Sequence, residues 1–159
     1  MKKIELTKGR FALVDDEDYE WLNQWKWWVS DGESKSYAIR RFEKNKKSHL
    51  IFMHKLILNV PKGMQGDHIN GNSLDNQRSN LRICTKDENN RNAKIRKDNK
   101  SGYKGVVWDK DNKEWKTRIW FNRKAIYLGR FNNIKEAVVT YNNAALKYHG
   151  KFAKLNFIE

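Results

Sequence analysis

The sequence predicts an α+β protein made of two small domains. Over residues 1–95, short strand-like segments alternate with short helical ones. Over residues 102–159, three strand patterns are followed by one amphipathic helix. Between them, residues 96–101 are polar and basic and lack apolar periodicity, which is typical of a linker. A chain of 159 residues has room for two such domains.

The composition indicates a folded, basic protein whose partner is a polyanion. Lysine and arginine number 33 against 19 aspartate and glutamate residues, a formal net charge of +14. Such a charge alone is typical of disorder, but aromatic residues make up 13% of the chain and include seven tryptophans. Large aromatic side chains supply the apolar burial that a small core needs. A basic protein attracts DNA, RNA or an anionic membrane, and we expect nucleic acid.

Membrane insertion, secretion and disulfide formation are not expected. No apolar stretch approaches the roughly 20 residues of a membrane span. The first residues turn polar at once instead of forming the apolar part of a signal peptide. We therefore expect a cytoplasmic protein with no membrane partner. The single cysteine, Cys84, excludes an internal disulfide and cysteine-pair zinc sites, so any metal must have oxygen and nitrogen ligands.

The first domain is predicted to begin with short strands around one acidic helix. Residues 11–14 predict a strand and residues 15–16 a helix N-cap, after which apolar residues recur at helical spacing. Residues 26–29 and 36–41 predict a hairpin whose tryptophans pack in the core. The basic residues of 40–47 either touch phosphate or form a solvated face.

A short helix over residues 54–58, ended by Pro61, precedes the densest run of polar side chains. Asp67 and His68 lie at the end of a predicted strand, where adjacent side chains point to opposite faces. Asn70-Gly71 predicts a tight turn, residues 81–84 a second strand, and Thr85 the cap of a helix. The pattern is therefore a β-hairpin followed by a helix.

These residue types suit metal-assisted acid–base chemistry. Histidine titrates near neutral pH and can accept a proton from water. Aspartate and asparagine supply the oxygen ligands that a hard cation such as Mg²⁺ prefers. The alternative is that Asp, Asn and Gly here only build turns, as an isolated Asp-His pair usually does. The entry into the second strand at Asn80 and the Asn-rich helix follow at a spacing with no obvious packing purpose, which favours the chemical interpretation.

This segment resembles the HNH homing endonucleases of phages and introns over about residues 50–95. The resemblance rests on Asp67-His68-Ile69-Asn70-Gly71, Asp75-Asn76, Asn80-Leu81-Arg82, and Thr85 with the helix that follows. It implies a ββα-metal (HNH) nuclease core with an N-terminal strand-rich extension, which hydrolyses phosphodiester bonds of double-stranded DNA.

The resemblance also implies a role for individual residues. His68 is the general base, and Asn80 is the central asparagine that orients it. Asp67 and Asn89 are the metal ligands, and Arg82 or Arg91 stabilises the cleaved phosphate. Because the family often has histidine where this chain has Asn89, Mg²⁺ or Mn²⁺ is expected rather than tightly bound Zn²⁺. Asn92 is a weaker ligand candidate, and His54 is expected to be structural or to support the ligands.

The second domain is predicted to be a three-stranded antiparallel sheet packed on one helix. The strands are expected over 103–108, 115–121 and 124–131, and the helix from Ile134 to a stop at Gly150. In the middle strand, Thr117, Ile119 and Phe121 alternate with Lys116, Arg118 and Trp120.

Residues 101–159 resemble the APETALA2/ethylene-response-factor DNA-binding domain over nearly its full length. The segments that carry the resemblance are Tyr103-Lys104-Gly105-Val106, residues 115–119, Tyr127-Leu128-Gly129-Arg130-Phe131, Glu136-Ala137, residues 141–145 and residues 150–157. The resemblance implies DNA reading by one sheet face, and the residues expected there are Lys104, Trp108, Lys116, Arg118, Trp120, Lys124 and Tyr127. Lys104 and Arg118 depart from the family's residues, which puts its usual base sequence in doubt.

Together these features predict a metal-dependent DNA endonuclease of the homing type, directed to its site by the C-terminal domain. We expect a monomer or weak dimer, since a single active site favours nicking. The alternative is a catalytically silent DNA-binding regulator, which the intact Asp67, His68 and Asn89 argue against. An RNA-binding protein is a third, weaker interpretation, because a sheet that enters a major groove suits B-form DNA.

Overall fold

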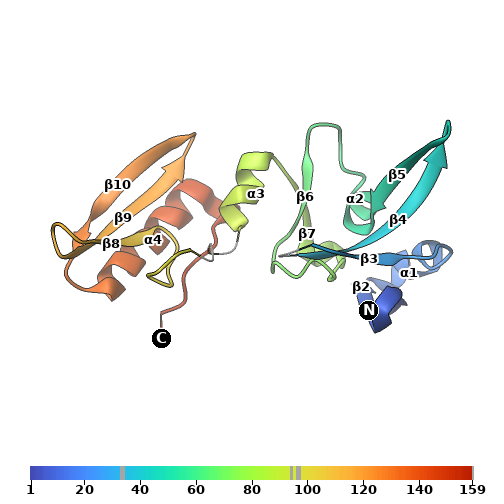
Figure 1. The fold of residues 1–159 in the computed structure, drawn as a ribbon, viewed down its shortest axis with the longest axis horizontal. Helices are drawn as coiled ribbons and strands as arrows, with labels where there is room; N and C mark the ends of the chain where they lie inside the picture. Colours follow the sequence, from blue (N-terminus) through green and yellow to red (C-terminus); the bar gives the residue numbers. More distant parts are fainter. Residues whose placement is uncertain (33–34, 94, 96–97, 159) are drawn as a thin grey trace. The chain divides into compact units, whose positions relative to one another are not determined.

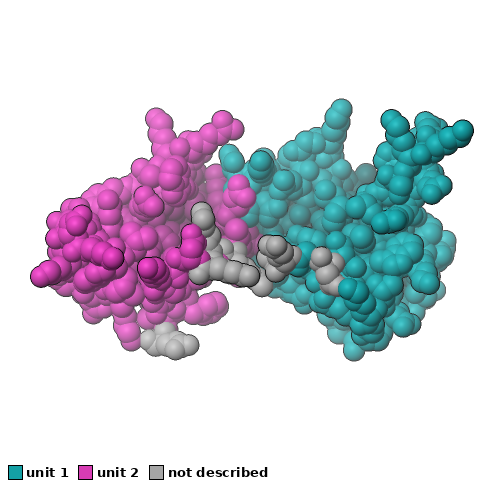
Figure 2. Space-filling view, viewed as in Figure 1, with its two compact units in different colours: residues 1–89 teal, residues 90–159 magenta. Residues whose placement is uncertain are grey.

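The computed structural model describes residues 1–32, 35–93, 95 and 98–158, which divide into two compact units, residues 1–89 and 90–159 (Figure 2). The division falls ahead of the linker expected at 96–101. Residues 96 and 97 lie outside the described residues, while Asn99 and Ser101 both donate hydrogen bonds to the carbonyl of Tyr103, at 3.0 and 3.1 Å. The linker therefore stays a prediction.

The described part of the first unit holds three small antiparallel sheets (Figure 1). Their strands are β1 (Lys2–Glu5) with β2 (Phe11–Val14), β3 (Trp28–Asp31) with β4 (Ser36–Lys44) and β5 (Lys47–Phe52), and β6 (Gln65–His68) with β7 (Leu81–Cys84). Helices α1 (Asp16–Leu22) and α2 (Met53–Leu58) lie between the strands, and α3 (Lys86–Asn92) follows β7. The sequence did not predict β1 and β5, because lysines occupy positions where a half-buried strand alternates.

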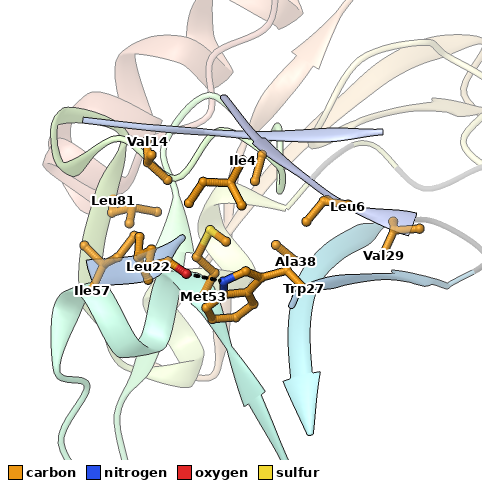
Figure 3. Close-up of a cluster of buried hydrophobic side chains, with 11 residues drawn as sticks. Ile4, Leu6, Val14, Leu22, Trp27, Val29, Ala38, Met53, Ile57 and Leu81 are labelled. Atoms are coloured by element: carbon orange, nitrogen blue, oxygen red, sulfur yellow. Dashed lines mark hydrogen bonds between the residues drawn. The ribbon is translucent and has the colours of Figure 1, made fainter. Parts of the chain in front are cut away.

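One apolar core joins these elements. Its buried side chains come from β1 to β4, α1, α2 and β7, as Figure 3 shows for Ile4, Leu22, Met53 and Leu81. The indole Nε1 of Trp27 donates a hydrogen bond to the carbonyl of Leu22 at 2.9 Å, at the end of α1 (Figure 3). The N-terminal strands are therefore part of the same folding unit as the β6–β7 hairpin.

Helix α2 lies against β6 through His54. This imidazole is buried, and a Cβ atom built on Gly66 would stand 2.6 Å from its Cδ2 atom, so only glycine allows the approach. Burial, helped by the neighbouring His68 and Lys55, lowers the pKa of His54 from 6.5 to about 3. The helix ends at Asn59, which has a left-handed backbone (φ 46°), before the expected stop at Pro61.

The second unit has the predicted three-stranded sheet and helix. Strands β8 (Val106–Asp109), β9 (Glu114–Phe121) and β10 (Lys124–Phe131) pair in the order β10-β9-β8. Helix α4 (Ile134–His149) covers one sheet face, with Val138, Tyr141 and Ala145 against Val106 and Ile119 in a second core. No helix among residues 1–32, 35–93, 95 and 98–158 is long and apolar enough to span a membrane.

Gly105 lies in close contact with Tyr141 of this second core. Its backbone has φ +77°, and an added Cβ would stand 2.1 Å from the Tyr141 ring. We expect Gly105→Ala to lower the free energy of unfolding of the second unit by at least about 2 kcal/mol more than Gly102→Ala does. Gly102 has a similar φ, +75°, but open space around it, so this control isolates the clash. Urea unfolding followed by resonances of the second unit measures the difference, and equal losses would contradict it.

His54 makes the stability of the first unit depend on pH. Its folded-state pKa lies below its unfolded value, so the unfolded chain binds more protons below pH 6.5. The stabilisation is complete above pH 6.5 and is lost toward pH 3, by at most about 1.4 kcal/mol per pH unit. We expect His54→Asn to flatten this slope in urea titrations followed by first-unit resonances. The exposed His49→Asn variant is the control, and a slope unchanged by His54→Asn refutes the assignment.

Candidate active site

The β6–β7 hairpin buries the predicted Asp-His pair. Its register places Asp67 opposite Arg82 and His68 opposite Leu81. Asp67 is 3% and His68 5% exposed, so neither is a solvated turn residue. Because neighbouring side chains of a strand point to opposite faces, the two groups have different surroundings.

The His68 imidazole is held by Asn76 and by aromatic rings. Its Nε2 atom lies 3.2 Å from Oδ1 of Asn76, and its ring centroid lies 4.8 Å from that of His54 in an edge-on arrangement. The Asn76 amide nitrogen donates to the carbonyl of Leu74, which turns Oδ1 toward the histidine. An amide oxygen only accepts, so the proton sits on Nε2 and the lone pair on Nδ1.

The charge state of His68 suits a proton acceptor. Burial lowers the pKa of His68 below 6.5, while the hydrogen bond to Asn76 and the charge of Asp67 act in the opposite direction. The net shift is downward, so the imidazole is neutral at neutral pH. A neutral imidazole with its lone pair on Nδ1 can take a proton from water.

Asn80 has a different role from the one expected. Its Oδ1 accepts a hydrogen bond from the backbone N–H of Asn70 at 2.9 Å, and its Nδ2 donates to the carbonyl of Asp75 at 2.8 Å. These bonds tie the turn after β6 to the start of β7. Asn76, four residues earlier, contacts the histidine instead. The Asp75-Asn76 pair belonged to the recognised pattern, but spacing alone did not show which asparagine faces the ring.

The loop that carries Asn76 is anchored to the N-terminal elements. The backbone N–H of Leu13 donates to the carbonyl of Leu74 at 2.9 Å, and the N–H of Asn76 donates to the carbonyl of Leu13 at 2.8 Å. Next to this contact, Arg78 binds the buried Asp18 of α1 through two hydrogen bonds of 2.8 and 2.7 Å. Strand β2 and helix α1 thus fix the position of the loop that carries Asn76.

Arg82 forms an ion pair with Asp67. Its Nε and Nη2 atoms lie 2.9 and 2.7 Å from Oδ2 of Asp67, and its side chain is only 13% exposed. The guanidinium therefore neutralises the buried carboxylate. In this structure the guanidinium is engaged inside the hairpin, and the expected role of Arg82 at a cleaved phosphate stays a prediction.

Asn89 reaches the hairpin from α3. Thr85 and Glu88 form a reciprocal cap: the Thr85 N–H donates to the Glu88 carboxylate at 2.8 Å, and the Thr85 hydroxyl accepts from the Glu88 N–H at 3.2 Å. One turn later, the Asn89 amide donates to Oε1 of Gln65 at 2.7 Å. Gln65 and Asp67 are two residues apart on β6 and share a face, so Asn89 lies on the Asp67 side of the hairpin.

A hollow of about 240 Å³ opens beside these residues. We call it the α2 hollow. Its lining comprises Tyr37, Phe52, His54, Lys55, Gln65, Gly66 and Asn89. Lys55 is exposed, and its ammonium lies 5.1 Å from the centroid of the Phe52 ring. The hollow therefore has one cationic side chain, Lys55, and two side-chain amides, Gln65 and Asn89, beside His54.

The donor set fits a hard cation. No group of three or more His, Cys, Asp or Glu side chains placed to hold a metal exists in the part of the chain that the structure describes. Burial raises the pKa of Cys84 to about 11, so its thiol stays protonated and is a poor ligand. The oxygen atoms of Asp67 and Asn89 are what Mg²⁺ takes from proteins, usually one or two at a time. They do not make a zinc-type set.

In the second unit, the sheet face away from α4 carries basic and aromatic side chains. Residues directly opposite in a sheet share a face, and the register pairs Tyr127 with Arg118 and Arg130 with Lys116. Arg118, Trp120 and Tyr127 are exposed, whereas Thr117 and Ile119 are buried, as the alternation predicted. We call Lys116, Arg118, Trp120, Tyr127 and Arg130 the outer face.

Three residues expected on this face lie elsewhere. Lys104 is half-buried and donates from Nζ to the carbonyls of Arg91 and Ala93, the latter at 2.8 Å, at the end of α3. Burial lowers the pKa of Lys104 to about 8. Trp108 stands opposite Trp115, with ring centroids 4.9 Å apart, and therefore leaves the sheet on the α4 side.

Lys124 shares that side, because its register partner is Phe121. The ring of Phe121 also lies under the guanidinium of Arg91, 5.3 Å from the ring centroid. Arg91 belongs to the second unit, so its expected role at the cleaved phosphate stays a prediction.

Comparisons with known proteins agree with both parts of this architecture. The family described as HNH endonuclease matches residues 59–91, the segment that contains β6, β7 and most of α3. Protein 3.8 of Escherichia phage T7 is 32% identical over 120 residues, which cover 76% of this chain and 97% of that protein. The "Uncharacterized HNH endonuclease L560" of Acanthamoeba polyphaga mimivirus is 28% identical over 155 residues, or 96% of this chain and 78% of that protein.

The C-terminal part matches a different group. The ethylene-responsive transcription factor WRI1 of Arabidopsis thaliana is 41% identical over 59 residues, which are 36% of this chain and 14% of that factor. The likeness therefore concerns one domain of a much longer protein. From the match at the β6–β7 hairpin and the relatives aligned over most of the chain, we conclude that the chain belongs to the HNH endonuclease family, and its C-terminal part is similar to the AP2-type factors.

Proposed function

We propose that this protein is a metal-dependent endonuclease of the homing type that hydrolyses phosphodiester bonds in double-stranded DNA. The observation that carries the proposal is the buried, neutral His68, whose Nε2 proton is engaged by Asn76 and whose Nδ1 holds the lone pair. HNH nucleases generally use divalent metal ions, and the AP2-type relatives named as transcription factors support DNA as the substrate.

His68 would act as the general base. Nδ1 would accept a proton from the water that attacks phosphorus, while Asn76 keeps the ring in one tautomer and orientation. The edge-on contact with His54 limits rotation of the ring further. Because His54 is itself neutral, it adds no charge that would oppose protonation of His68.

Asp67 and Asn89 would hold the divalent cation. When bound, such a cation neutralises the scissile phosphate and stabilises the departing oxygen. Arg82 holds the Asp67 carboxylate in place from the opposite strand. Lys55, an exposed cation that lines the α2 hollow, would offset phosphate charge there.

The outer face of the second unit would supply sequence-directed binding. Lysine and arginine neutralise phosphates, and arginine also pairs with guanine. Trp120 and Tyr127 are 58% and 55% exposed, an exposure that core packing does not explain. Tethering by this face raises the local concentration of DNA at the first unit. We propose this face, reduced to Lys116, Arg118, Trp120, Tyr127 and Arg130, as the DNA-reading surface.

A second candidate is a catalytically silent DNA-binding regulator. The observation in its favour is the Asp67–Arg82 ion pair, which occupies an oxygen that a cation needs. In that case the hairpin would be a structural element that positions α3.

Nicking of supercoiled plasmid separates the two candidates. We expect nicking with Mg²⁺, none with excess EDTA, and a loss of about 100-fold or more for His68→Ala, as for removal of a general base. Binding of a labelled duplex in Ca²⁺ buffer should persist in that variant. A chain that binds DNA but never nicks it in Mg²⁺ or Mn²⁺ is the regulator, and cutting in EDTA excludes the metal.

Asn76 is expected to act by positioning. Asn76→Ala removes the acceptor for Nε2 but keeps the backbone bonds to β2, so we expect kcat to fall by about 10- to 100-fold with little change in KM. Asn76→Asp keeps an acceptor and should restore most of the rate. Asn80→Ala is the comparison: it releases the turn and should lower the melting temperature instead. If Asn76→Ala and Asn80→Ala lower both the melting temperature and kcat to the same extent, Asn76 has only a structural role.

A further inference from the structure

A free-standing basic hairpin projects from the first unit. Strand β3 pairs with β4 only from Ser36 to Ile39, whereas β4 and β5 continue as partners from Arg40↔Ile51 to Lys44↔Lys47. Residues 40–51 therefore form a two-stranded ribbon, to which no third strand is added within the described part of the chain, and Figure 1 shows it reaching away from the sheet. All side chains from Arg41 to Leu50 are exposed. An isolated pair of strands is only marginally stable in water, so packing does not explain the extension.

The tip of the ribbon concentrates positive charge. Residues 41–50 contain Arg41, Lys44, Lys46 and Lys47 against one acidic residue, Glu43. Lys44 and Lys47 stand directly opposite each other, where like charges destabilise a strand pair. The two-residue turn between them contains Lys46 with a left-handed backbone (φ 59°). A polyanion along the tip would remove this repulsion.

Arg40, on the same hairpin, is by contrast a cation that packs against the rest of the unit. Its guanidinium lies 4.2 Å from the centroid of the Trp25 ring and is shielded by the body of the unit. Among the described residues, neither Arg41 nor the three lysines of the tip form an ion pair or stack on a ring. Their charge is therefore available to a ligand.

The base of the ribbon is the wall of the candidate active site. Tyr37 at the start of β4 and Phe52 at the end of β5 both line the α2 hollow, next to His54 and Asn89. Arg41 lines a second hollow, of about 410 Å³, with the exposed Trp28 and with Ile39. A DNA strand whose phosphates bind along the ribbon from its tip would thus reach the α2 hollow.

We propose that the ribbon is a DNA-contacting arm, whose Arg41, Lys44, Lys46 and Lys47 bind phosphates of the duplex and guide it to the α2 hollow. The proposal rests on the function proposed above. The DNA major groove is about 12 Å wide and admits a two-stranded ribbon. The major groove of an RNA duplex is too narrow for one, which makes double-stranded DNA the expected occupant.

The salt dependence of DNA binding tests the arm. In the non-cutting His68→Ala background, Lys44→Gln, Lys46→Gln and Lys47→Gln are combined, and the Kd for a labelled duplex is measured over a range of salt. Each lost phosphate contact lowers the slope of log Kd against log salt by about 0.9, so we expect a decrease of about 2 to 3. The control combines Lys3→Gln, Lys26→Gln and Lys62→Gln, which removes the same charge from exposed lysines of the same unit.

The outcomes separate this inference from the proposed function. A smaller slope for the ribbon variant alone supports the arm, and equal slopes for both variants overturn it, because net charge then explains the loss. Equal binding of an RNA duplex overturns the groove assignment. If the parent chain nicks plasmid while the ribbon variant keeps the parent's slope, the arm fails and the nuclease stands. If neither the parent chain nor His68→Ala binds a duplex, both fall. Unchanged Trp27 resonances confirm that the variants are folded.

Discussion

The hydrogen bond between Asn76 and the buried His68 is the contact on which the candidate site depends. A histidine free in solution populates both tautomers and rotates, whereas this ring has one acceptor on Nε2 and an imidazole edge against its face. Asn76 is itself held by two backbone hydrogen bonds between its loop and β2. The N-terminal strands, which hold none of the candidate site residues, therefore help to determine the geometry of His68. A shared core that includes Ile4, Val14 and Leu81 makes this dependence cooperative.

The same unit shows how a basic chain places its few buried charges. Asp67 and Asp18 are both nearly inaccessible, and each is bound by an arginine that approaches from another element. Leaving either carboxylate unpaired would be costly, because a buried charge without a partner loses its hydration and gains nothing in return. His54 and His68 avoid a buried charge by remaining neutral, since burial lowers the pKa of both. The surplus positive charge stays on exposed lysines, where a polyanion can reach it.

The sequence predicted the order of the elements better than the contacts of individual side chains. Periodicity located β9, β10 and α4 closely, and the turn and cap residues located β6, β7 and α3. Strand β5 was missed because it is exposed at its start and therefore shows no alternation. Asn80 and Asn76 carry the same amide, and only the fold of the loop decides which one meets the ring. Lys104 was expected on an outer surface, but strand β8 begins only at Val106, and the lysine turns inward to the end of α3.

A donor set of one carboxylate and one amide has a consequence for how such an enzyme would work. Two oxygen atoms from the protein, one of them on a carboxylate already paired with Arg82, would bind Mg²⁺ weakly, so phosphate and water must complete its shell. Affinity for DNA must then come from elsewhere, because the reacting centre contributes little of it. The outer face of the second unit and the proposed arm of the first would provide that affinity, since each carries exposed cations. Binding through both would raise the local phosphate concentration at the α2 hollow, and a weak cation site then suffices.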